Sequence, residues 1–123
     1  MVVFFQAQSV SPLENRRGGI RVTTSFYPLY FFATQIGGAD VEVVNITPAG
    51  AEPHDYELTA KEIAQITRSD LLIINGGSFE PWGNRITREL ANSQTTVVVA
   101  GSAFINRDIE EGGERIQDPH VWL

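Results

Sequence analysis

The sequence predicts an α/β protein in which four parallel strands form one sheet with helices on both faces. Short runs rich in Val, Ile, Leu and Thr alternate along the chain with helix-like segments. Such alternation is typical of right-handed crossovers between parallel strands, which place helices against the sheet. A chain of 123 residues is long enough for one domain with its own hydrophobic core.

Composition excludes several classes of function. A net charge of −6 argues against nucleic acid as a partner, because phosphate binding needs a basic surface. The absence of cysteine excludes disulfides, thiolate metal ligands and cysteine nucleophiles. Apolar residues make up 42% and charged residues 20%, which is typical of a folded globular protein. No apolar run is long enough for a transmembrane helix.

Residues 1–19 are expected to form a flexible tail. The stretch from Gln6 contains scattered Ser, Asn and Pro residues and ends in the pair Gly18-Gly19. The opening Met1–Phe5 is too short for the full apolar core of a signal peptide and is consistent with the end of one. We therefore place the folded domain at residues 20–123.

Four apolar or β-branched runs are predicted as strands: Ile20–Phe26, Val41–Ile46, Asp70–Asn75 and Thr95–Ala100. The third run is apolar without a break, which predicts a strand at the centre of a parallel sheet. Right-handed crossovers then favour the strand order 2-1-3-4.

Three helices are predicted between these strands. The first begins near Pro28 and ends at Gly37-Gly38, and its apolar residues lie nearly all round, which predicts deep burial. The second runs from Thr59 to about Ser69 and starts with a capping box between Thr59 and Glu62. The third runs from about Trp82 to Asn92.

Two further segments have compositions that can indicate phosphate binding or cation binding. Gly76-Gly77-Ser78 lacks the rest of a phosphate-binding fingerprint, so a sharp turn explains its glycines better. The acidic residues Asp108, Glu110, Glu111 and Glu114 predict a solvated acidic loop between Asn106 and Gln117, rather than a lid that collects cations.

The two histidines are the candidate metal ligands. His54 and His120 each follow a proline and lie next to a carboxylate, Asp55 in one case and Asp118 in the other. Metal-bound histidines usually donate their second ring N–H to a carboxylate or a carbonyl, so this setting favours a metal site. A solvated histidine in a loop is the alternative for each. Both follow strands whose carboxyl ends meet at one edge of the sheet, which favours a shared site.

Four motifs occur together in order: Phe26-Tyr27-Pro28-Leu29, Gly50-x-Glu-Pro-His54-Asp-Tyr-Glu57, Asn75-Gly76-Gly77 followed by Trp82, and Asp118-Pro-His-Val-Trp-Leu123. This pattern closely resembles the zinc- and manganese-binding subunits of ABC importers, the cluster A-I (TroA-like) solute-binding proteins. The resemblance covers about residues 20–123.

The resemblance implies a metal held between two (β/α) lobes joined by a long helix. It makes His54 and His120 the ligands of the N-terminal lobe, with the remaining ligands in a second lobe that this sequence lacks. It further implies Zn²⁺ or alternatively Mn²⁺ as the metal, an ABC importer permease as the partner, and a periplasmic or extracytoplasmic, membrane-associated location. A Glu-Pro-His tripeptide replaces the usual Asp-Pro-His, and no histidine-rich loop is present.

Two other classes remain open. An enzyme on a flavodoxin-like sheet would use His54 or His120 as a general base beside Asp55 or Asp118, although no nucleophile elbow or cofactor fingerprint is present. The adhesion and metal-storage roles of the family form a third class.

A single lobe leads to two further expectations. Apolar groups around Phe79, Trp82, Val121 and Trp122 are expected to be exposed and to promote self-association. Replacing Glu80 by glutamine is expected to leave metal binding nearly intact.

Overall fold

A computed structural model describes residues 18–103, 108–118 and 120. Its main sheet contains four parallel strands in the order β2-β1-β3-β4, as the sequence predicts. The strands are β1 (Ile20–Thr24), β2 (Val41–Asn45), β3 (Leu71–Ile74) and β4 (Thr96–Val99). The helices are α1 (Tyr27–Gly37), α2 (Ala60–Arg68) and α3 (Gly83–Glu89), with single 3-10 turns at Gly38–Asp40 and Ala100–Ala103. Of the expected tail, residues 1–17 lie outside the described residues.

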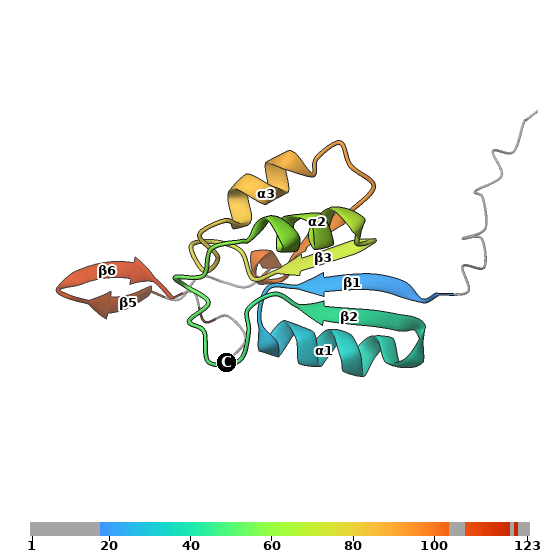
Figure 1. Cartoon of the computed structure of the whole chain (residues 1–123). Coiled ribbons are helices and arrows are strands. Elements are labelled where there is room, and N and C mark those ends of the chain that lie inside the picture. Colours follow the sequence, from blue (N-terminus) through green and yellow to red (C-terminus); the bar gives the residue numbers. More distant parts are fainter. Residues whose placement is uncertain (1–17, 104–107, 119, 121–123) are drawn as a thin grey trace, which may run out of the picture.

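The helices lie on the two faces of the sheet as expected, with α1 on one face and α2 and α3 on the other (Figure 1). Parallel register pairs Val22 of β1 with Val43 of β2 and Leu71 of β3, so these three residues point to the same face. None of the helices in the described part of the chain is long and apolar enough to cross a bilayer.

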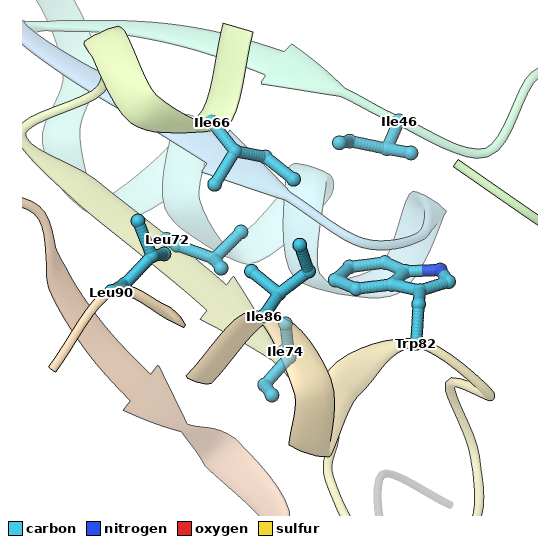
Figure 2. Packing of buried hydrophobic residues seen from close by; sticks show 7 residues of the cluster. All are labelled: Ile46, Ile66, Leu72, Ile74, Trp82, Ile86 and Leu90. Atoms are coloured by element: carbon cyan, nitrogen blue, oxygen red, sulfur yellow. The ribbon is translucent and has the colours of Figure 1, made fainter. Parts of the chain in front are cut away.

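The larger core fills the space between the sheet and the helices α2 and α3. Its buried members come from both sides of that layer: Ile46, Ile66, Leu72, Ile74, Trp82, Ile86 and Leu90 (Figure 2). Burying each such side chain contributes roughly 1.5–3 kcal/mol. A second cluster of Phe26, Leu29 and Phe79 lies on the other side, with Ile73 packed against it.

The expected exposure of Phe79 and Trp82 is wrong. Phe79 is 1% exposed and Trp82 is 2% exposed, because the turn between β3 and α3 directs one ring into each of the two clusters. Val121 and Trp122, the other members of the expected patch, lie outside the described residues.

The deep burial expected for α1 is also wrong. Leu29 is its one buried residue, whereas Tyr27, Phe31 and Phe32 are exposed and Ile36 is 86% exposed. The helix packs on β1 and β2 through one side only. No second described helix lies on this face of the sheet, so the outer apolar side of α1 remains uncovered.

The acidic loop expected between Asn106 and Gln117 is instead a β-hairpin over its described part. Strands β5 (Asp108–Glu111) and β6 (Glu114–Gln117) pair antiparallel and place Ile109 opposite Ile116. Gly112 and Gly113 both have positive φ, 61° and 85°, which a two-residue hairpin turn requires. The Gly-Gly pair between alternating residues is therefore a stronger signal of a hairpin than the acidic composition is of a loop.

Candidate metal centre

The loop that bears His54 connects β2 to α2 and is tied down at both ends. At its start, the backbone N–H of Asp55 donates to the carbonyl of Glu52, closing a turn around Pro53. At its end, the Tyr56 hydroxyl donates to Oε1 of Glu62 in α2 over 2.6 Å. The predicted capping box between Thr59 and Glu62 is confirmed, since each donates a backbone N–H to the side chain of the other. His54 is thus presented on a braced loop.

The Tyr56–Glu62 hydrogen bond changes the pKa of both groups. The bond to Glu62 is the main cause that raises the pKa of Tyr56, and burial and the negative charge of Glu62 add to it. For Glu62, burial raises the pKa, but hydrogen bonds from Tyr56 and Thr59 and the charge of Lys61 outweigh it, so the net shift is downward. The anchor is therefore strongest when Tyr56 is neutral and Glu62 is ionised.

His120 is oriented by its neighbour Asp118. Oδ1 of Asp118 lies 2.8 Å from Nδ1 of His120. The same oxygen accepts the backbone N–H of His120 over 3.0 Å. A carboxylate at this position favours the tautomer with the proton on Nδ1, which leaves Nε2 as the nitrogen that could bind a metal. This is the carboxylate–histidine arrangement found at metal sites.

The structure brings the two histidines together. Their ring centroids are 5.5 Å apart and the ring planes are inclined by 75°. Two imidazoles bound tetrahedrally to one zinc, with nitrogens at ~2.0–2.1 Å from the ion, would hold their centroids about 5 Å apart. The observed spacing fits two ligands of one ion.

The carboxylate beside His54 is not the one that the sequence suggested. Asp55 is exposed, whereas Oε1 of Glu52 lies 3.9 Å from Nε2 of His54 and also accepts the backbone N–H of His54. The proline between Glu52 and His54 explains this, because the turn folds the earlier residue back over the ring. Within the described ranges, no group of three or more His, Cys, Asp or Glu residues converges.

Sequence reasoning missed two residues that support His54. The ring of Phe79 packs against the imidazole, with centroids 4.5 Å apart and planes inclined by 65°. The next residue, Glu80, is buried and accepts hydrogen bonds from the ends of β1 and β3. A buried carboxylate in a chain of this size is unusual, but the sequence around it, Ser-Phe-Glu-Pro, resembles an ordinary turn.

The sequence and the fold match proteins of known function. A family model described as the periplasmic zinc-uptake complex component A, ZnuA, matches residues 22–123. The chain belongs to this family. The resemblance to metal-binding subunits of ABC importers is thereby confirmed.

Individual relatives of the zinc-uptake family agree. The zinc-binding protein AdcA of Streptococcus pyogenes serotype M1 is 32% identical over 126 residues, covering 86% of this chain and 24% of its own length. The high-affinity zinc uptake system protein ZnuA of Bacillus subtilis is 32% identical over 124 residues, covering 89% of this chain and 38% of its own length. This chain thus spans well under half the length of either relative.

A solved structure shows the same fold. The Zn(II)-bound ZnuA-like domain of Streptococcus pneumoniae AdcA matches with a TM-score of 0.74 and 32% identity, over 85% of this chain and 38% of that chain. The parallel α/β lobe predicted from the sequence is therefore the fold of the zinc-uptake family.

Proposed function

We propose that this chain supplies half of a binding site for a divalent transition metal and serves a protein that delivers the ion to an ABC importer. The observation behind this proposal is that the rings of His54 and His120 lie side by side, with their centroids 5.5 Å apart. One ion could therefore contact a nitrogen of each ring. The remaining ligands come from a second lobe, which the chain would need for tight binding.

Zinc is the favoured metal and manganese the alternative. Imidazole nitrogen suits zinc, whereas manganese prefers a larger share of oxygen ligands. The carboxylates nearest the rings are those of Glu52 and Asp118. Glu52 accepts the backbone N–H of His54, and Asp118 accepts the backbone N–H of His120 and lies within hydrogen-bond distance of its Nδ1. Both carboxylates therefore act as orienting partners. The two relatives and the solved domain described above are named as zinc-binding or zinc-uptake proteins.

The proposed partner beyond the ion is the importer's membrane permease, and the proposed location is periplasmic, or extracytoplasmic and membrane-associated. Family membership supports both, because the matching family is described as periplasmic and as part of a zinc-uptake complex.

No specific observation favours the enzyme alternative. The hydroxyl of Ser25, which follows β1, would be a serine nucleophile for such an enzyme, but it is buried and donates to Oε1 of Glu80. Nδ1 of His120 lies 2.8 Å from Oδ1 of Asp118, and the ring packs against the imidazole of His54. Both histidines are better explained as ligands than as bases.

We also propose that the isolated chain self-associates, through a different surface from the one that the sequence suggested. Leu29, Phe32 and Ile36 follow one another along one flank of α1, and Leu29 belongs to the cluster that contacts Ile73 of β3. The proposal places this flank towards the open half of the sheet, where Val98 of β4 is exposed. We call Phe32, Ile36 and Val98 the α1–β4 surface.

A second copy of the chain is the proposed occupant of the α1–β4 surface. Neither α1 nor β4 contains a charged residue, whereas the chain as a whole carries −6. Two copies can therefore meet here without bringing like charges together, and the contact removes apolar area from water.

The metal site is tested by zinc titration followed through the side-chain nitrogens of both histidines by NMR. The proposal expects the signals of His54 and His120 to shift together at one stoichiometric ion. Shifts confined to one ring, or absent from both, would count against a shared site.

A further inference from the structure

A single buried carboxylate joins three parts of the chain at the metal edge of the sheet. Glu80 is 4% exposed, and its Oε1 accepts the Ser25 hydroxyl over 2.5 Å and the Asn75 N–H over 2.7 Å. Its Oε2 accepts the N–H of Gly76 over 2.8 Å. Ser25 follows β1 and Asn75 follows β3, so one side chain fixes the carboxyl ends of the two central strands.

Phe79 connects this carboxylate to the metal ligand. Its ring is 1% exposed and packs between Phe26, at a centroid distance of 4.4 Å, and His54, at 4.5 Å. Its backbone N–H donates to the carbonyl of Gly76, which closes the turn that Glu80 holds from within. The position of the Phe79 ring thus depends on the turn, and the orientation of the His54 ring depends on Phe79.

We infer that Glu80 is a positioning residue of the metal site, acting on His54 through Phe79. This inference rests on the metal site proposed above. The carboxylate holds the turn, the turn holds the phenyl ring, and the ring limits the rotation of the imidazole. A ligand held ready in its bound orientation loses less entropy when the ion arrives, so the ion binds more tightly.

Glutamine at position 80 tests this chain of contacts with little change in shape. Three donors converge on the carboxylate, and an amide would turn its own NH₂ group towards at least one of them. The turn would have to move, and Phe79 with it. We expect Glu80→Gln to weaken zinc binding about tenfold, the lower end of the range for residues that orient ligands. The buried hydrogen bonds of Glu80 thus replace the sequence-based expectation that this substitution leaves metal binding nearly intact.

Thr95→Val is the matched control. Thr95 is also buried, and its hydroxyl donates to the carbonyl of Ser69 at the opposite edge of the sheet, just before β4. Losing this bond lowers stability without touching the metal edge. We expect Thr95→Val to lower the unfolding temperature while leaving zinc affinity unchanged, measured well below unfolding.

A second readout needs no metal. The Phe79 ring shifts the resonances of the His54 ring protons, because the two rings lie edge to face. Glu80→Gln is expected to move these resonances towards the values of an unstructured peptide, whereas Thr95→Val leaves them in place. Phe79→Leu, which removes the ring itself, is expected to abolish the shift and to weaken zinc binding, and it replaces Glu80→Gln if that variant does not fold.

The outcomes separate the two proposals. Parent-like zinc affinity and parent-like His54 resonances in Glu80→Gln, or an equal loss of affinity in Thr95→Val, would overturn the positioning role. If the parent itself bound no zinc, the proposed function would fail, while the His54 resonances of the metal-free variants would still decide whether Glu80 positions the ring.

Discussion

The imidazole of His54 lies edge to face against the buried ring of Phe79, with centroids 4.5 Å apart. This contact joins His54, a proposed metal ligand on the loop after β2, to a core residue on the turn after β3. The second proposed ligand, His120, is oriented separately by Asp118. The two histidines therefore meet at one edge of the sheet by independent means, one through packing and one through a carboxylate.

In the turn after β3, a side chain at the first glycine is expected to lower stability more than a side chain at the second. Gly76 has a φ of 89°, and a Cβ there would collide with Cγ1 of Val99. Gly77 also has a positive φ, 65°, but a Cβ there would meet open space. Gly77→Ala should cost about 1–2 kcal/mol from backbone strain, and Gly76→Ala about 1–3 kcal/mol more from the collision. Urea unfolding measures the difference, and equal costs would contradict it.

The loop anchor between Tyr56 and Glu62 should make stability depend on pH at both ends of the scale. The raised pKa of Tyr56 gives stability that is present below about pH 10 and is lost as pH rises through the folded-state pKa. The lowered pKa of Glu62 gives stability that is present above about pH 4.5 and is lost as pH falls through the folded-state pKa.

Tyr56→Phe tests this anchor. Urea unfolding across pH should show that the variant loses the Tyr56 part of the alkaline decline and is less stable than the parent near neutrality. Tyr27→Phe, at an exposed position on α1, is the control and should keep the parent's profile. A parent-like profile in Tyr56→Phe would show that the hydrogen bond contributes nothing.

Self-association should respond to charge placed on the α1–β4 surface. Ile36→Glu adds a carboxylate to the proposed contact at a residue that is 86% exposed, so the fold should not be disturbed. We expect light scattering to show a dimer for the parent and a monomer for this variant. Asn84→Glu adds the same charge on α3, across the sheet, and should remain a dimer. A monomeric parent at high concentration would overturn the proposal.

The sequence was sufficient for the four strands of the main sheet, their order and the proximity of the two histidines. Local signals specify these features directly: β-branched runs, the capping box at Thr59, and the rule that parallel strands end at a common edge. The family motifs around His54 and His120 agreed with that geometry.

Other features depend on tertiary context that no local pattern records. The apolar residues of α1 indicated burial, but whether Ile36 is covered depends on a neighbouring helix and not on α1 itself. The role of Glu80 depends on three donors, two of which come from the end of β3 and one from the end of β1. The hairpin at Gly112-Gly113 was different, since its turn signal was present and was outweighed by the acidic composition around it.

Calorimetric titration of zinc into the parent, His54→Ala and His120→Ala tests whether the two histidines share one metal site. We expect one weak site per chain in the parent and loss of most binding in either variant. Asp55→Asn, at an exposed carboxylate beside His54, should bind as the parent does. Zinc binding in both histidine variants at the parent's affinity would contradict a site shared by His54 and His120.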